Sequence, residues 1–306
     1  MAGSTPASAT SEESAALAAR PVSYGAERWR LARRLVHVPA GAVGLVLTAA
    51  VVFVALFADQ LSPGDPFAAA GDSLEPPSGD HWMGTDNLRR DILRGVVHGA
   101  RTSMTVVVAV VAMASVLGIV IGAVAGYRGG IVDDVLMRIT EMLQSIPRFF
   151  LAILVVGLFG AGMDNLILLL GLTSWPLLAR VVRAETMSVK RWPFVESARA
   201  IGAGDGRILL HHVVPNVLPA AVVVISLMGS RVILIEAGLS FLGLGDPNQI
   251  SWGYLINNAQ RFLTVAWWMS VFPGLAIVLA VLGLSLLSDA LNDVLNPLTA
   301  PRRPGG

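Results

Sequence analysis

The chain has 306 residues, of which 54% are hydrophobic and 14% are charged, and its formal net charge is +1. Soluble domains carry about 25% charged residues, so this composition indicates a protein of the lipid bilayer and excludes an ordinary soluble domain. The absence of cysteine excludes disulfides, thiolate nucleophiles and cysteine-ligated metal clusters. The near-neutral charge gives no sign of a nucleic-acid partner.

Six apolar stretches predict six membrane-spanning helices, because a span needs about 20 largely apolar residues. Four of them contain no Asp, Glu, Lys or Arg, namely 35–58, 102–127, 208–230 and 262–288. The other two, 149–163 and 165–179, are shorter and flank Asp164, which predicts a helical hairpin with Asp164 near its turn. To span the bilayer, the first of these two must extend back through Pro147 and Arg148.

The placement of arginine orients these spans, because Lys and Arg gather in cytoplasmic loops. Most of the 22 Lys and Arg residues fall in the tails and inner loops if both termini are cytoplasmic. The expected segments are a cytoplasmic N-terminal tail at 1–34, a first span with an extracytoplasmic loop at 35–97, a five-helix core at 98–290 that includes a cytoplasmic loop at 181–212, and a cytoplasmic C-terminal tail at 291–306.

The extracytoplasmic loop ends in a segment with helical periodicity. Thr85 or Asp86 can cap a helix there, because both are good N-cap residues. The apolar residues that fall on one face of this helix are Leu88, Ile92, Leu93, Val96 and Val97. We expect the helix to lie in the membrane interface. It serves either as an interfacial elbow or as a contact for an external partner.

The long cytoplasmic loop contains the signals of a short helix. Pro193 suits its first turn, and Glu196 lies near its positive N-terminal end. Ser197 and Ala198 have small side chains, so one side of the helix is narrow. Gly202 then ends the helix, because glycine tolerates the left-handed conformation that a C-cap needs.

A second helix follows in the same loop. Asp205 can cap it, and it runs into Pro215 at the mouth of the fifth span. The loop is then a helix, a glycine elbow and a second helix that is rigidly joined to a span. Such an arrangement would transmit a movement of a cytoplasmic partner to the fifth span. The alternative is that the loop only connects two spans.

Charged residues inside spans each need a reason, because a central Arg or Asp costs about 3 kcal/mol on insertion scales. Asp134, Arg138 and Glu141 are spaced to pair along one helix face. Arg148 has no local acid and is either an anchor at the interface or a path-lining residue. Glu236, near the outer end of the fifth span, is either a gate residue or a buried structural acid.

The residues predict neither a metal site nor an ATP site in this chain. The adjacent His211 and His212 point about 100° apart on a helix, which suits chelation poorly. The one lysine, Lys190, is followed by an arginine, so the Gly-Lys-Ser/Thr phosphate-binding loop is missing.

The cytoplasmic loop resembles the EAA loop of ABC-importer permeases. That motif is Glu-Ala-Ala, then a glycine four positions beyond the last alanine and a proline 13 further on. The residues that match it are Glu196, Ala198, Gly202 and Pro215. The departures are Ser197, His212 and Val214.

Other segments resemble the dipeptide and oligopeptide permeases of that group, the DppC/OppC type. They are Gly84-Thr85-Asp86 with Arg90-Asp91, the segment 236–245, Ser251-Trp252-Gly253, Asp289-Ala290-Leu291 and Pro297. The sequence departs from the usual pattern at Arg89, Asn292 and Asn296.

The resemblance implies an all-α membrane protein with six transmembrane helices and the type I ABC-importer permease fold. Such a permease hydrolyses nothing and holds no cofactor of its own. It translocates di- or oligopeptides across the cytoplasmic membrane while two separate ATP-binding subunits, which hold ATP and Mg²⁺, dock on the EAA loop. A homologous second permease (DppB/OppB type) and an extracytoplasmic solute-binding protein complete the system.

The same resemblance assigns roles to particular residues. The ATPase-coupling residues are Glu196, Ser197, Ala198, Gly202, Asp205 and Pro215. Arg148 and Glu236 are candidates for the translocation path or its gate.

Other classes of function compete with this one. An ATPase-independent ion-coupled carrier or channel has intramembrane carboxylates or broken helices in paired halves, whereas the acids here cluster at helix ends. An intramembrane enzyme needs a nucleophile with a base, or paired aspartates within spans, and the sequence shows neither. Within the importer group, permeases for nickel, haem or antimicrobial peptides share this shape, so the ligand stays open.

Overall fold

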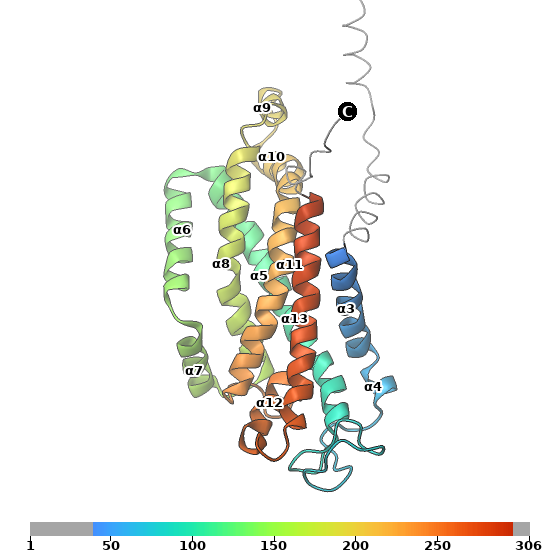
Figure 1. Ribbon diagram of the computed structural model, residues 1–306. Coiled ribbons are helices and arrows are strands. Elements are labelled where there is room, and N and C mark those ends of the chain that lie inside the picture. The colour runs from blue at the N-terminus through green and yellow to red at the C-terminus, as the bar shows by residue number, and fades with distance from the viewer. Residues whose placement is uncertain (1–38, 296–306) are drawn as a thin grey trace, which may run out of the picture.

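The computed structural model describes residues 39–295, which form a bundle of helices (Figure 1). Within this range the chain has isolated β-bridges and no strand. The helices are α3 (Pro39–Leu56), α4 (Ala58–Leu61), α5 (Ile92–Arg128), α6 (Gly130–Ser145), α7 (Arg148–Phe159), α8 (Met163–Val189), α9 (Pro193–Ala200), α10 (Asp205–Ile208), a π-helical turn (Leu209–Val213), α11 (Val214–Phe241), α12 (Trp252–Ala259), a 3-10 turn (Gln260–Phe262) and α13 (Trp268–Leu295).

The predicted tails fall mostly outside this range. The N-terminal tail, 1–34, and the motif residue Pro297 both lie outside the described residues. Of the C-terminal tail, 291–306, only 291–295 are described, and they extend α13.

Five helices are long and apolar enough to cross a membrane, and the bent pair of α6 and α7 makes a sixth if it is counted as one span. The four long apolar stretches of the sequence coincide with α3, α5, α11 and α13. Asp164 lies in the first turn of α8, where the hairpin turn was expected. The structure therefore confirms an all-α membrane fold with up to six spans.

The third span differs from the continuous helix that the sequence suggested. Helices α6 and α7 meet at an 82° bend, with Ile146 and Pro147 between them. Proline has no N–H for a helical hydrogen bond, and it disfavours helical geometry at the residue before it. Ile146 is accordingly extended, so α6 ends at Ser145 and a new helix begins at Arg148.

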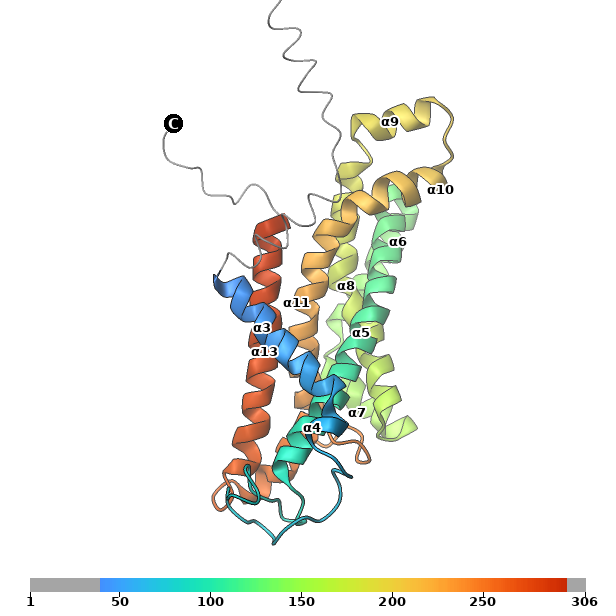
Figure 2. The same ribbon diagram turned by 90° about the vertical axis from the view of Figure 1, so that its right-hand side faces the viewer.

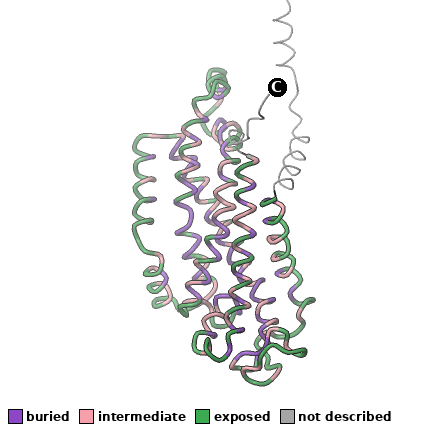
Figure 3. The backbone as a smooth tube through the Cα atoms, in the orientation of Figure 1, coloured by how far each residue is buried: buried purple, intermediate pink, exposed green. Residues whose placement is uncertain are grey.

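Buried residues concentrate in α5, α8 and α11, while α6 and α7 are largely exposed (Figure 3). A stripe of glycines on α5 faces α8: Gly118, Gly122 and Gly126. A Cβ atom at Gly118 would lie 2.9 Å from the side chain of Leu178, and one at Gly126 would lie 2.6 Å from the carbonyl oxygen of Arg183. The missing side chains let the two backbones approach closely, as small residues do between membrane helices.

The bundle has two different ends (Figures 1 and 2). Helices α9 and α10 project at one end, where α3 begins and α13 ends. At the opposite end lies the distal cap, which consists of residues 62–91 and α12.

The structure contradicts the predicted start of the helix that follows the extracytoplasmic loop. Helix α5 begins only at Ile92, where the carboxylate of Asp91 accepts a hydrogen bond from the Arg94 N–H at 3.0 Å. The residues before it form a turn that is closed by an antiparallel bridge between Thr85 and Asp91. Neither Thr85 nor Asp86 starts a helix, and the apolar residues from Ile92 onward belong to α5; the interfacial position of its first turns stays a prediction.

Arg90 holds the distal cap together. Its Nε donates to Asp86 Oδ2 at 2.6 Å, and its Nη1 donates to the Tyr254 hydroxyl on α12 at 3.1 Å. Burial works to lower the pKa of Arg90, but the hydrogen bond with Tyr254 and the charge of Asp86 hold the pKa above its ordinary value. The carbonyl of Thr85 also accepts a bond from Trp268 Nε1 at 3.1 Å. Motif segments more than 160 residues apart therefore meet in one buried cluster.

Candidate functional site

Helix α9 projects from the end of the bundle (Figure 2). It is the first arm of a bent segment, residues 193–215, which we call the elbow. Pro193 occupies the first turn of α9, and Glu196 is exposed in that turn, as predicted. Val195 and Ala198 are buried on the opposite face. The Ser197 hydroxyl donates to the Pro193 carbonyl at 2.9 Å, so this side chain stays close to its own helix. The exposed face of α9 thus carries the Glu196 carboxylate, together with the larger side chains of Phe194 and Arg199.

Gly202 forms the bend of the elbow. Its φ is +87°, which only glycine adopts without strain. The Gly202 N–H donates to the Arg199 carbonyl at 3.0 Å, and the Ala203 N–H donates to the Ala198 carbonyl at 3.1 Å. This is the Schellman pattern that ends a helix. Space is not the constraint, because nothing lies within 4 Å of the position of an added Cβ.

The second arm begins at Asp205, but Asp205 does not cap it as predicted. The N-cap residue is Gly204, and no side chain bonds to the free N–H groups. The Asp205 carboxylate instead accepts a hydrogen bond from the Tyr127 hydroxyl at 2.8 Å, near the end of α5. The sequence reading missed this contact, because the two residues are 78 positions apart.

The second arm runs into the membrane without a break. Between α10 and α11 the helix widens into a π turn, in which the Val214 N–H donates to the Leu209 carbonyl. Pro215 follows directly, in the first turn of α11. Asp205–Phe241 forms one candidate span of 37 residues. The second arm is therefore continuous with the fifth span, as the sequence indicated, and the rigidity of this join stays a prediction.

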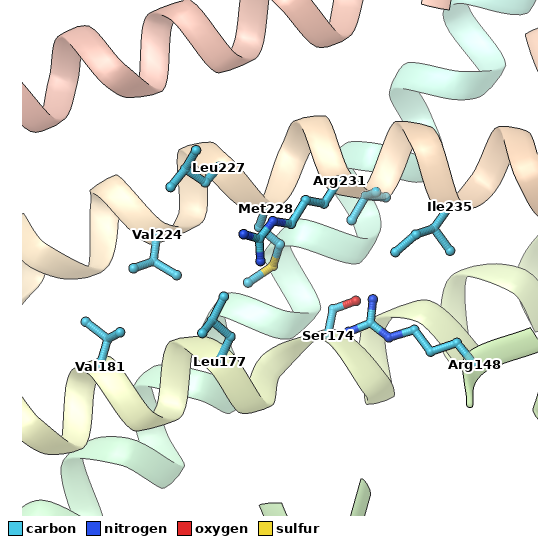
Figure 4. Close-up of a pocket in the computed structure, with 10 residues that line it drawn as sticks. Arg148, Ser174, Leu177, Val181, Val224, Leu227, Met228, Arg231 and Ile235 are labelled. Atoms are coloured by element: carbon cyan, nitrogen blue, oxygen red, sulfur yellow. The ribbon is translucent and has the colours of Figure 1, made fainter. Parts of the chain in front are cut away.

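A second feature is a pocket that opens on the side of the bundle, bordered by α7, α8 and α11 (Figure 4), and its lining residue Arg231 is exposed. Arg148 enters it as the first residue of α7, and Arg231 enters it from α11. The guanidinium of Arg148 donates to the Thr173 carbonyl at 3.1 Å. The remaining lining is Ser174 and apolar side chains, with no carboxylate among the lining residues. We call this site the arginine pocket.

Glu236, the other path candidate, lies apart from the arginine pocket. Its side chain is buried, and its carboxylate accepts hydrogen bonds from Ser240 at 2.8 Å and from Ser103 at 3.3 Å. The Ser103 hydroxyl also accepts a bond from the Trp252 N–H at 3.3 Å. Glu236 thus joins α11 to α5 and α12, which fits the structural acid that the sequence left as an alternative. Its role in a path or gate stays a prediction.

The charged residues of α6 are arranged differently from the prediction. Arg138 and Glu141 lie 3.7 Å apart as expected, but no ion pair joins Asp134 to Arg138 in the described part of the chain. The neighbouring Asp133 instead accepts a hydrogen bond from Arg183 Nη2 on α8 at 2.6 Å. The sequence carried no local signal for this pair, because 50 positions separate the two residues.

Comparison with known proteins finds relatives over most of the chain. Residues 118–300 match the family described as binding-protein-dependent transport system inner membrane component. Over 258 residues the chain is 35% identical to the dipeptide transport system permease protein DppC of Alkalihalophilus pseudofirmus, a match that covers 83% of this chain and 84% of the relative.

Two further relatives carry related names. The chain is 38% identical over 275 residues to the glutathione transport system permease protein GsiD of Pectobacterium atrosepticum, with 89% of this chain and 90% of the relative covered. It is 33% identical over 258 residues to the oligopeptide transport system permease protein OppC of Bacillus subtilis, with coverages of 83% and 84%.

Proposed function

Because the chain belongs to the family of binding-protein-dependent transport system inner membrane components, we propose that it is a permease subunit of an ATP-driven importer for di- and oligopeptides. The family consists of multi-pass inner-membrane transport permeases, so the chain is a transport subunit and not an enzyme. In our proposal two separate ATP-binding subunits hold ATP and Mg²⁺ and hydrolyse the nucleotide. A binding protein on the outer side delivers the ligand, and a homologous second permease completes the path.

The elbow is the observation that carries this proposal. It projects beyond the bundle, where a partner can reach it, and its second arm is continuous with α11 (Figure 2). Helix α11 itself has 28 residues and is about 42 Å long at 1.5 Å per residue. Closure of the ATPase subunits would therefore displace α9 and tilt α11 along its whole length, which is a rigid-body switch between inward-open and outward-open states.

Each coupling residue has a physical part in this mechanism. Glu196 and Ser197 present the exposed surface that a partner contacts, while Ala198 packs against the chain itself. Gly202 sets the angle between the arms, and Asp205 ties the second arm to α5. Pro215 lies at the join with the span. The elbow end then faces the cytoplasm, and both termini lie on that side.

The peptide ligand is supported by the names of the relatives. The three permeases described above are named for dipeptides, for oligopeptides and for glutathione. A shared fold does not by itself fix a ligand, so the class of ligand needs its own measurement.

The experiment is a pull-down of the tagged chain in mild detergent from its native membrane, with the co-purifying proteins identified by mass spectrometry. The complex is then placed in vesicles, and ATP hydrolysis and uptake of a labelled tripeptide are followed. The proposal expects a second permease, ATP-binding subunits, and uptake that stops without ATP. Recovery of the chain alone even after cross-linking, or uptake driven by an ion gradient without ATP, would exclude it.

A further inference from the structure

The arginine pocket holds two positive charges and no negative one. Arg148 and Arg231 project from different helices toward the space between α8 and α11 (Figure 4). Across residues 39–295, no carboxylate lies within 4.0 Å of either guanidinium as an ion-pair partner. Within the described residues these two side chains make one hydrogen bond, from Arg148 to the Thr173 carbonyl, which is a neutral group. The local charge is therefore uncompensated within the described chain.

The pocket lies deep in the span region. Arg231 precedes the last residue of α11, Phe241, by ten positions, which is about 15 Å at 1.5 Å per residue. The hydrocarbon core of a bilayer is about 30 Å thick. Ionisable residues at such depth are rare in membrane proteins, and they mark pathways for polar cargo by default.

A third polar group in the pocket also lacks a partner. Ser174 is 6% exposed, and among the residues described its Oγ has no hydrogen-bond partner. Ser174 lines the same pocket as the two arginines (Figure 4). A buried hydroxyl without a partner is unfavourable, so a ligand group in the pocket would gain a hydrogen bond with it.

The donors present select one kind of ligand chemistry. Guanidinium groups bind carboxylates with paired N–H···O bonds, and a serine hydroxyl can donate a further one. Helix α7 begins at Arg148, so the positive end of its dipole adds to the field at the rim. Broken membrane helices place anionic cargo groups at such ends. The cavity volume of about 140 Å³ far exceeds the roughly 15 Å³ that one water needs.

We propose that the arginine pocket receives the terminal carboxylate of a peptide in transit, with the Arg148 and Arg231 guanidinium groups as ligands and the Ser174 hydroxyl as a further donor. This inference rests on the proposed function. The apolar remainder of the wall, including Leu177, Leu227 and Ile235, accepts the last side chain of the peptide without selecting its shape. An anionic lipid is the less fitting source of the anion, because lipid headgroups lie at the membrane surface and not at this depth.

The test uses the whole complex, purified through the tagged chain and placed in vesicles, with labelled tri-alanine as the probe. Arg231→Met is compared with Arg231→Lys, which keeps the charge, and with Ser174→Ala. Arg138→Met on α6 is the matched control, because Arg138 is exposed and lies outside the pocket. Uptake, ATP hydrolysis without peptide, and co-purification of the partners are all measured.

We expect Arg231→Met to lower uptake about tenfold, the factor that one lost charge-assisted hydrogen bond represents. Assembly and peptide-free ATP hydrolysis stay within about twofold, since no partner contact is assigned to this side chain. Arg231→Lys keeps only part of the uptake, because an ammonium group retains the charge but not the paired N–H···O geometry. Ser174→Ala loses less than Arg231→Met, and Arg138→Met equals the wild type. In the wild type, a tripeptide with a photoreactive C-terminal residue cross-links to α8 or α11, and this cross-link disappears in Arg231→Met.

Four results would overturn the inference in distinguishable ways. If the wild-type complex takes up no peptide, the proposed function fails and the pocket assignment fails with it. If the wild type transports and Arg231→Met transports equally well, only the pocket assignment fails. If the partners dissociate from Arg231→Met alone, the arginine pairs with an acid of another subunit. If the defect vanishes in vesicles without anionic lipid, the pocket binds a lipid headgroup.

Discussion

The Tyr127 hydroxyl donates a hydrogen bond to the Asp205 carboxylate at 2.8 Å, and this bond ties the end of α5 to the second arm of the elbow. A second tie lies close by. Lys190, just after α8, donates from Nζ to the Gly126 carbonyl at 2.8 Å. The elbow is therefore fastened to α5 both where the chain leaves α8 and where it returns toward α11.

We predict that Tyr127→Phe weakens coupling without preventing assembly. A hydrogen bond of this kind contributes about 0.5–1.5 kcal/mol, and its exposed position places it at the low end of that range. Peptide taken up per ATP hydrolysed should fall about two- to fivefold, as measured in vesicles. Asp205→Asn is the control, because an amide oxygen still accepts the bond. Equal ratios for Tyr127→Phe and the wild type would contradict the role of this tie.

The bend at Gly202 gives a second prediction. Gly202→Val places a branched side chain at φ +87°, where strain of about 1–2 kcal/mol opposes the native turn. The chain should insert and assemble, because the change lies outside the spans, but uptake per ATP should fall roughly five- to thirtyfold.

Gly204→Val is the matched control for that variant. Gly204 has φ −69° and also has nothing within 4 Å of an added Cβ. This variant should therefore couple normally. A similar loss in both variants would mean that any side chain in the bend interferes, and that the conformation of Gly202 is not the cause.

The ion pair between Asp133 and Arg183 leads to a prediction about stability. Asp133→Asn removes the charge from a pair that is 9% exposed at the aspartate and 34% exposed at the arginine. Allowing for screening on the arginine side, we expect a loss of about 1 kcal/mol, which lowers the melting temperature by about 2–4 °C.

Asp134→Asn tests whether that loss belongs to the pair. Asp134 is the next residue, it is exposed, and it has no ion pair in the described part of α6. Its substitution should leave the melting temperature of the detergent-solubilised complex unchanged. A drop of equal size in both variants would point to the net charge of α6 instead.

The distal cap should be the most sensitive part of the chain to loss of one charge. Arg90→Met leaves the Asp86 carboxylate buried, with 3% of its side chain exposed and no counter-charge. Breaking a buried pair in this way costs about 3–5 kcal/mol. We expect rapid proteolysis in residues 62–91 at temperatures where the wild type resists.

A second substitution separates the pair from the rest of the cap. Arg90→Met combined with Asp86→Leu removes both charges and should recover much of the resistance. Arg261→Met, an exposed arginine at the same end, should behave as the wild type. No recovery in the double variant would show that the hydrogen bond of Arg90 with Tyr254 matters more than its pair with Asp86.

Much of the fold could be predicted, because hydropathy and local capping signals decide it. The spans follow from their apolar length, and the elbow follows from Pro193 and Gly202, whose preferences hold in any context. The break at Pro147 was less evident. A proline can kink a span or end it, and only the packing of the surrounding helices decides between the two.

The misses arose where contacts between distant parts of the chain decided the outcome. Thr85, Asp86 and Asp91 are all good cap residues, and the sequence cannot say that Asp86 is already engaged by Arg90. Likewise Asp205 could cap a helix locally, but its carboxylate instead accepts a hydrogen bond from the Tyr127 hydroxyl. The arginine pocket needed the fold itself, since three helices must meet to assemble it.

The glycine stripe of α5 has a consequence for how the molecule moves. Gly118, Gly122 and Gly126 lie against side chains and carbonyl groups of α8 so closely that no side chain fits between the two helices at these positions. We therefore expect α5 and α8 to move together as one unit. Rocking is then accommodated by other elements, and we expect the bent, largely exposed pair of α6 and α7 to be one of them.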